Sequence, residues 1–292
     1  MSSWQGKSKG TKTGYRFFIW LLKNFGVLPA YFILRFVVVY YFIFSYKSSK
    51  AILSLYRHKL GYNRLQSLLK LYKNYYLLGQ SIIDKIVMMA GIKNKFTFNF
   101  DGEDNLRKIA SLQKGGILLS AHIGNWDIAG YLLKRIETTI NIVLFDGEHK
   151  KIKEYLEEVT EKKKLNIIVI KNDLSHIYQI SEAFNRNELV CMHADRFLDG
   201  NKKITASFLG VEAKLPAGPF LLASTFKVPV SFVFAVKESK FHYHFFASDI
   251  KNYEYSNKEV AMEKMTNDFT KEMEKKVKDY PEQWFNYYNF WQ

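Results

Sequence analysis

The sequence predicts an α/β fold, a mixed and largely parallel sheet flanked by helices, with an N-terminal hydrophobic helical segment that anchors the chain to a membrane. After Gly91, short apolar runs alternate with amphipathic stretches, a pattern typical of an α/β sandwich. The chain has 292 residues, 48% of them hydrophobic, so it can bury one large core. Before Gly91, apolar residues at helical spacing predict helices instead.

The elements after Gly91 follow from this alternation. Short runs rich in β-branched and aromatic residues predict strands at 96–100, 116–120, 141–145, 166–170, 188–193, 229–236 and 242–247. Amphipathic stretches predict helices near 103–113, 126–135, 148–164, 174–184, 219–226 and 258–279. We therefore expect one α/β domain over residues 95–292.

The N-terminal region divides into a basic polar tail (1–13), a membrane-embedded helical anchor (14–46) and a helical basic region (47–94). The run 27–45 contains one charge, Arg35, and as a helix it would be about 28 Å long, close to the roughly 30 Å of a bilayer core. Basic residues flank it on both sides, so the positive-inside rule gives no orientation. A simple span, a hairpin bent near 26–29, a helix embedded in one leaflet and a buried core helix all remain open; a cleavable signal peptide fits less well.

The net charge of +15 lies entirely in the first third of the chain. Residues 1–95 hold 16 lysines and arginines against a single acid, Asp84, whereas the remainder is neutral. This charge surrounds an apolar segment and no nucleic-acid motif accompanies it, so we expect an anionic membrane surface as partner and no nucleic acid. The only cysteine, Cys191, excludes an intramolecular disulfide.

The motifs exclude several kinds of chemistry and favour one turn. There is no phosphate-binding glycine loop, dinucleotide fingerprint, zinc-spaced Cys/His cluster or G-x-S-x-G, so neither cofactor nor metal is predicted. Three of the seven histidines have a carboxylate five residues later, but only the pair His122 and Asp127 lies where a strand gives way to a helix. There Gly124 and Asn125 permit an irregular backbone, so Asp127 can fold back onto the imidazole.

Such a pair suits general-base catalysis. A neutral imidazole takes a proton from an acceptor hydroxyl or amine, and a carboxylate fixes its tautomer. The acceptor's own oxygen or nitrogen then attacks a thioester, so no serine or cysteine nucleophile is needed. The bland alternative is a histidine that caps a helix or packs in a turn.

Four blocks give a more specific indication: ILLSAHIGNWDIAG, VCMHADRFLDG, ASFLGVEAKLPAGPFLLASTFKVPV and YPEQWFNYYNFW. Their order and spacing resemble the bacterial lipid A late acyltransferases of the lysophospholipid acyltransferase superfamily. The resemblance implies an acyltransferase-like α/β sandwich and acyl transfer from acyl carrier protein, or from acyl-CoA, to a lipid acceptor. It also implies a location at the inner membrane, with the catalytic domain on the cytoplasmic face.

The resemblance implies His122 as general base and Asp127 as its acidic partner. Predicted substrate-binding residues are Asn125, Trp126, Asp195, Arg196 and Gly218. Trp126 could wall an acyl tunnel or pack in the core. Arg196 could bind a phosphate or carboxylate, or brace a loop together with Asp195. Gly218 is expected to permit a tight approach of the chain, and Pro219 to begin a helix.

Two departures concern the acceptor. The lipid A enzymes usually have Glu at the position of Asp127, and they end the last block with basic residues where Asn286 and Asn289 stand. A lipid A-like acceptor is the leading expectation. A glycerolipid, an aminolipid or a pigment remains an alternative, as does, in another class, a non-catalytic membrane-binding protein. The aromatic stretch 284–291 could pack in the core or anchor the chain at a membrane interface.

Overall fold

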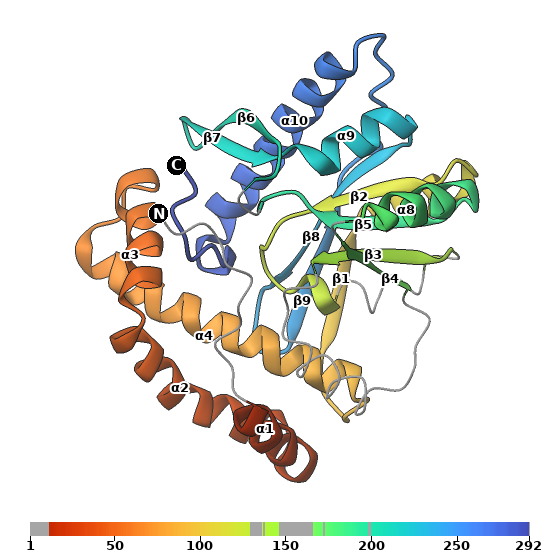
Figure 1. The fold of residues 1–292 in the computed structure, drawn as a ribbon. Helices are drawn as coiled ribbons and strands as arrows, with labels where there is room; N and C mark the ends of the chain where they lie inside the picture. The colour runs from red at the N-terminus through yellow and green to blue at the C-terminus, as the bar shows by residue number, and fades with distance from the viewer. Residues whose placement is uncertain are drawn as a thin grey trace.

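A seven-stranded sheet forms the centre of the computed structural model, which describes residues 12–128, 136, 138–145, 166–171, 173–197 and 200–291 (Figure 1). Its order is β1-β9-β8-β2-β5-β3-β4, and every pair of neighbours is parallel except β8 and β9. The predicted mixed, largely parallel sheet is therefore confirmed. The strands are β1 (Thr97–Asp101), β2 (Gly116–Ser120), β3 (Ile140–Phe145), β4 (Asn166–Ile170), β5 (Leu189–His193), β8 (Val230–Lys237) and β9 (His242–Ala247).

Helices flank this sheet as the sequence pattern predicts. They are α5 (Glu103–Ser111), α8 (Ser175–Asn185), α9 (Ala217–Phe226) and α10 (Lys258–Asp279). Phe269 of α10 packs against Phe220 of α9 and Phe232 of β8, which ties both helices to the sheet. A helix begins at Trp126, but the rest of the predicted helix 126–135 lies largely outside the described residues, and the one predicted over 148–164 lies entirely outside them.

One hairpin was not predicted from the sequence. Strands β6 (Lys203–Phe208) and β7 (Val211–Pro216) pair in antiparallel fashion beside α10. Their turn, Leu209 and Gly210, has positive φ at both residues (51° and 74°), as a type I′ turn requires. Leucine rarely adopts that conformation, so the sequence lacked the Asn-Gly or Asp-Gly signal from which such a turn is predicted.

The N-terminal region is helical: α1 (Lys12–Phe25), α2 (Val27–Phe44), α3 (Tyr46–Ser54), a π-helical stretch (Leu55–Lys59) and α4 (Arg64–Met89). The chain breaks between α1 and α2 at Gly26, whose φ is +79°, within the predicted bend. Helix α2 runs along α4 (Figure 1). Gly79 of α4 allows this close approach, because a Cβ there would lie 2.4 Å from a methyl carbon of Leu34.

Helix α2 has two different faces. By length and composition it could cross a membrane, with a mean hydropathy of 2.0. Yet one face is buried against the protein, through Val27, Ala30, Tyr31, Leu34 and Val38. The other face exposes large apolar side chains, namely Leu28, Phe32, Phe36, Val39, Tyr40, Ile43 and Phe44. One hydrophobic core joins the N-terminal helices to the sheet, so α2 is packed on the part of the chain that contains the sheet.

Candidate active site

His122 and Asp195 lie at the carboxyl ends of two neighbouring strands. Strands β2 and β5 are parallel, with Ser120 opposite His193, and each residue of the pair follows its strand by two positions. The backbone N–H of Ala194 donates to the carbonyl of Ser120 at 2.8 Å, which holds the two strand ends together. The carboxyl edge of a parallel sheet is where ligand sites form in such folds.

Asp195 binds His122 at two points. Its Oδ1 lies 2.7 Å from Nδ1 of the imidazole, and its Oδ2 accepts the backbone N–H of His122 at 2.9 Å. Asp195 is only 1% exposed, and burial alone would raise its pKa. The charge and hydrogen bond of His122, with Arg196 nearby, outweigh burial and hold the pKa of this carboxyl well below its usual range. An ionised Asp195 keeps the proton on Nδ1, which leaves the lone pair of the neutral ring on Nε2.

His193 covers one face of the His122 ring. The two ring centroids are 4.1 Å apart with planes at 24°, and Trp126 meets His193 edge-on at 4.7 Å. Burial lowers the pKa of His193 well below its usual value, and the proximity of His122 lowers it further. His193 is therefore neutral. Sequence analysis does not place His193 at the site, although the parallel register puts it beside the end of β2.

His122, His193 and Asp195 bring possible metal-ligand atoms within 4.8 Å of one another. Nitrogen lone pairs lie in the ring plane, and a zinc–nitrogen bond is about 2 Å long. Two nearly parallel rings 4.1 Å apart therefore direct their lone pairs side by side, not toward one point. The arrangement suits stacking better than joint coordination of a metal.

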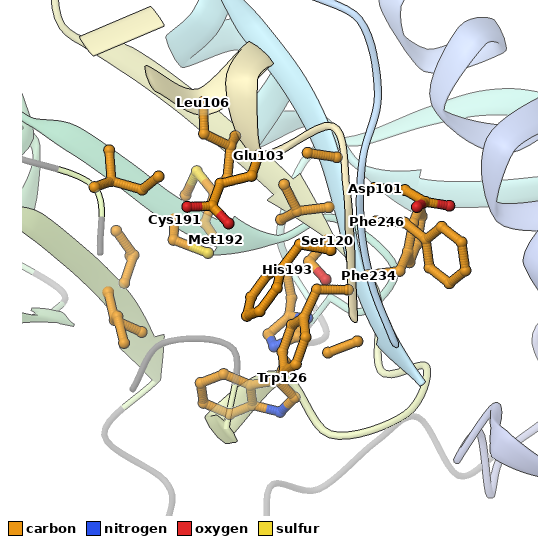
Figure 2. Close-up of a pocket in the computed structure, with 18 residues that line it drawn as sticks. Asp101, Glu103, Leu106, Ser120, Trp126, Cys191, Met192, His193, Phe234 and Phe246 are labelled. Atoms are coloured by element: carbon orange, nitrogen blue, oxygen red, sulfur yellow. The ribbon is translucent and has the colours of Figure 1, made fainter. Parts of the chain in front are cut away.

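An apolar cavity opens beside this cluster (Figure 2). Trp126 and His193 lie at one end of it in this view, and Glu103 and Leu106 of α5 lie at the other. Its remaining lining comes mostly from the sheet: Phe100, Asp101, Ser120, Ile136, Ile142, Val143, Cys191, Met192, Val233, Phe234, Ala235, Phe245, Phe246 and Ala247. Burial raises the pKa of the Cys191 thiol to about 12, so this side chain is an inert part of the wall. A cavity of this composition suits a hydrocarbon chain.

The expected contact between His122 and Asp127 is replaced by two others. The carboxylate on the His122 ring is that of Asp195, whereas Oδ1 of Asp127 pairs with Nζ of Lys85 in α4 at 3.0 Å. The helix begins at Trp126, so Asp127 belongs to its first turn and its side chain meets α4. His122 stays with the strand ends. We therefore correct the expected carboxylate partner of the His122 ring from Asp127 to Asp195.

The turn after His122 depends on Gly124 and Asn125. Gly124 has φ +68°, and a Cβ there would lie 1.8 Å from the carbonyl oxygen of Ala235, so the close approach to β8 requires glycine. Asn125, predicted to contact substrate, is 3% exposed. Its amide donates to the carbonyl of Ser81 at 3.0 Å and to the hydroxyl of Tyr243 at 3.4 Å. The amide therefore holds the turn, and a contact of Asn125 with substrate stays a prediction.

The C-terminal block supports the same turn from behind. The backbone N–H of Phe285 donates to the carbonyl of His122 at 2.9 Å, and that of Gly124 donates to the carbonyl of Gln283 at 2.8 Å. Trp284 is buried, as are Phe285 and Phe290. Of the two alternatives for this stretch, these side chains take the packing role.

Of the other predicted site residues, one lines the cavity and the rest lie apart from its lining. Arg196 donates to the carbonyl of Phe285, which braces the loop after β5; its role in anion binding stays a prediction. Trp126 lines the cavity. Pro219 lies in the first turn of α9 as predicted. Gly218, in the same turn, has nothing within 4 Å of where a Cβ would be, so the expected tight approach is wrong.

The comparison with protein families indicates acyl transfer. A family model described as bacterial lipid A biosynthesis acyltransferase matches residues 75–292. Curated proteins give no match. Among solved structures the chain is similar to the 1-acyl-sn-glycerophosphate (LPA) acyltransferase, PlsC, from Thermotoga maritima, at 14% identity over 85% of this chain and 94% of that chain, with a TM-score of 0.41. The family match includes both strand ends that carry His122 and Asp195.

Proposed function

Because this chain belongs to the bacterial lipid A biosynthesis acyltransferase family, we propose that it moves a fatty acyl chain from an acyl thioester to a lipid-linked hydroxyl or amine, with His122 as general base. The observation that supports this is the bond between His122 and the buried carboxylate of Asp195, beside an apolar cavity. The stack with His193 adds a second restraint on the same ring.

The reaction needs one base and no covalent enzyme intermediate. Nε2 of His122 removes the proton from the acceptor O–H or N–H, and the freed electron pair attacks the thioester carbonyl carbon. The C–S bond then breaks, and the departing sulfur takes the proton back from the imidazolium. Asp195 stabilises the positive ring between these two transfers. A positioned base of this kind contributes about 10²–10⁴-fold to the rate.

The cavity supports the assignment of the acyl chain. A chain whose carbonyl lies at His122 could run past Trp126 and His193 toward Leu106 of α5, against side chains that are mostly apolar. Each buried methylene contributes about 0.8 kcal/mol. We propose acyl carrier protein as the donor, with acyl-CoA as the alternative.

The acceptor is proposed to be lipid A-like and to reach the site from the membrane. The exposed apolar face of α2 would enter one leaflet, while its buried face stays packed on the protein. The excess of basic residues in the first 95 would hold this face on an anionic leaflet. We therefore propose the cytoplasmic face of the inner membrane as the location of the catalytic part.

The test joins an enzyme assay with lipid analysis. Purified protein in lipid nanodiscs is given acyl carrier protein thioesters and acyl-CoA, and His122→Ala is compared with the wild type at matched folded fraction. We expect His122→Ala to lose at least 100-fold in kcat. A near-full rate would overturn the mechanism.

Mass spectrometry of lipids from cells with and without the gene identifies the acceptor. A missing acyl chain on lipid A supports the proposal, and an altered glycerolipid or aminolipid overturns that acceptor. An unchanged lipid profile favours a non-catalytic membrane-binding protein.

A further inference from the structure

We propose that a buried polar cluster of Asp84, Lys237, Tyr31 and Tyr243 positions the turn that carries His122, and that it makes this turn sensitive to how α2 is seated. The inference rests on the proposed role of His122 as general base. Asp84 is the only acidic residue among the first 95. It lies on α4, the helix that separates α2 from the sheet (Figure 1).

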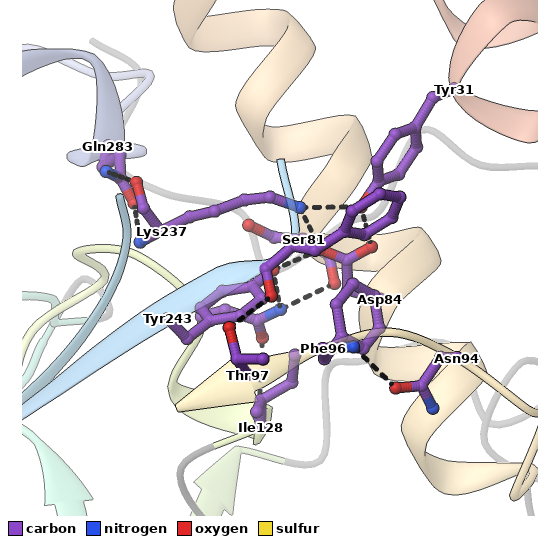
Figure 3. Close-up of polar contacts among 12 residues, drawn as sticks. Tyr31, Ser81, Asp84, Asn94, Phe96, Thr97, Ile128, Lys237, Tyr243 and Gln283 are labelled. Atoms are coloured by element: carbon purple, nitrogen blue, oxygen red, sulfur yellow. Dashed lines mark hydrogen bonds and ion pairs between the residues drawn. The ribbon is translucent and has the colours of Figure 1, made fainter. Parts of the chain in front are cut away.

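The cluster joins four elements through one carboxylate (Figure 3). Oδ1 of Asp84 accepts the hydroxyl of Tyr31 from α2, and Oδ2 accepts Nζ of Lys237 from β8 and the hydroxyl of Tyr243 from β9. Nζ of Lys237 also donates to the hydroxyl of Tyr31 at 2.7 Å. A displacement of α2 would move the hydroxyl of Tyr31 and so disturb the carboxylate that also binds both strands.

Burying the two charges of this cluster costs free energy, because both are removed from water. Asp84 and Lys237 are both buried, and replacing such a pair by apolar side chains of similar size is often neutral or stabilising. Apolar packing between α2 and α4 already attaches the helices to each other. The ion pair and the two tyrosine hydroxyls also fix how the elements are oriented, because each donor must point at a particular oxygen of Asp84.

Two branches lead from the cluster to the turn after His122. In the first, the hydroxyl of Tyr243 receives the amide of Asn125, which also donates to Ser81, one turn before Asp84 on α4. Asn125 in turn starts the helix, because its Oδ1 accepts the N–H of Ile128 at 3.4 Å. A displaced Tyr243 would move Asn125, three residues after the base.

The second branch runs through the backbone of Lys237. Its N–H donates to Oε1 of Gln283 at 2.8 Å and its carbonyl accepts Nε2 of Gln283 at 2.9 Å. The carbonyl of Gln283 accepts the N–H of Gly124. Both branches thus end on Gly124 and Asn125, and these residues set where the His122 ring stands relative to Asp195.

The decisive variant removes both charges together. Asp84→Leu/Lys237→Met leaves no unpaired buried charge, so we expect it to fold with a melting temperature near that of the wild type. In the nanodisc assay we expect kcat to fall at least tenfold, while KM for the thioester changes less than about twofold, because the cluster touches no substrate. Glu182→Gln/Arg186→Gln, an exposed pair at the C-terminal end of α8, is the control and should keep the wild-type rate.

Two milder variants keep the inference testable if the double variant fails to fold. Tyr31→Phe removes one hydroxyl from α2, and Asn125→Ala cuts the first branch; we expect each to lower kcat several-fold without changing KM. Adding Asn125→Ala to the double variant should lower kcat little further, because both changes act on the same turn after His122. Wild-type kcat in the folded double variant, or in both milder variants, would overturn the inference. If His122→Ala is inactive in the same assay, the proposed function survives that result.

Discussion

Asp195 binds the backbone N–H of His122 and its ring nitrogen with the two oxygens of a single buried carboxylate. The parallel pairing of β2 with β5 makes this possible, because it brings the residues two positions past each strand side by side. A carboxylate held at two points fixes both the position and the tautomer of the imidazole.

The first prediction concerns this carboxylate. Asp195→Asn keeps the size of the side chain but removes the charge that stabilises the imidazolium and fixes Nδ1–H. We expect kcat to fall about 10²–10⁴-fold, the range of a lost general base, with KM for the thioester little changed. Steady-state kinetics at matched folded fraction, checked by circular dichroism, measure the effect.

Asp127→Asn is the matched comparison, since it makes the same change in the carboxylate that sequence spacing favoured. In the structure that carboxylate pairs with Lys85, so its loss should cost less than tenfold in kcat, as expected for a partly exposed ion pair. A larger loss for Asp127→Asn than for Asp195→Asn would restore the original assignment.

A second prediction concerns pH. Burial depresses the pKa of His193 in the folded state, while the unfolded chain titrates near 6.5. As pH falls below about 6.5, the unfolded state takes up this proton first, so stability is lost toward acid. We expect the free energy of unfolding of the wild type to drop by about 1 kcal/mol more than that of His193→Phe between about pH 7.5 and pH 5.5.

Denaturant titrations in detergent at the two pH values measure that difference. His58→Phe, at an exposed position, is the control, and it should follow the wild type. Equal losses for the wild type and His193→Phe would mean that His193 is not held neutral. Because His193→Phe keeps a flat ring on His122, we also expect it to retain more activity than His193→Ala.

Most of the sheet could be predicted from the sequence, because each strand is a short apolar run between turn signals. The boundaries of β2, β4 and β9 and of α10 match the predicted ranges. The hairpin of β6 and β7 was missed although β6 alternates polar and apolar residues, which is the pattern of a half-buried strand. Its turn begins with a leucine and so lacks the Asn-Gly or Asp-Gly signal that marks a short hairpin.

Local sequence identifies one member of the His122 and Asp195 pair but not the contact between them. His122 is identified by a turn between strand and helix, which is local. Its partner is 73 residues away, and only the neighbour relation of β2 and β5 brings the two together. The spacing could therefore single out His122, but it favoured the nearer carboxylate. The block containing Asp195 did supply the signal, since it too follows a strand end.

A third prediction concerns chain length. Cys191 is part of the cavity wall, and its high thiol pKa makes it unreactive. Cys191→Phe would fill part of the space, so we expect a preference for shorter acyl chains. Each methylene that no longer fits costs about 0.8 kcal/mol, or about fourfold in kcat/KM. Competition among thioesters of graded length measures this shift.

Cys191→Ala is the control for that variant, because it removes the thiol without filling the cavity. It should accept the wild-type lengths or slightly longer chains. An unchanged length profile in Cys191→Phe, with the protein folded, would mean that the acyl chain lies elsewhere.

The last prediction concerns membrane attachment. Phe36 and Phe44 lie on the free face of α2, 64% and 69% exposed, and make no part of the core. Replacing each by asparagine removes about 1.5–3 kcal/mol of apolar transfer free energy. We therefore expect binding to vesicles of anionic phospholipid to weaken at least tenfold per substitution, with an unchanged melting temperature.

Tyr178→Asn on α8 is the control, since Tyr178 is 75% exposed but belongs to another part of the surface. Sedimentation with vesicles at low and high salt separates the two contributions, because salt screens the basic residues but not the aromatic face. Equal binding of all three variants would mean that α2 does not contact the bilayer with this face.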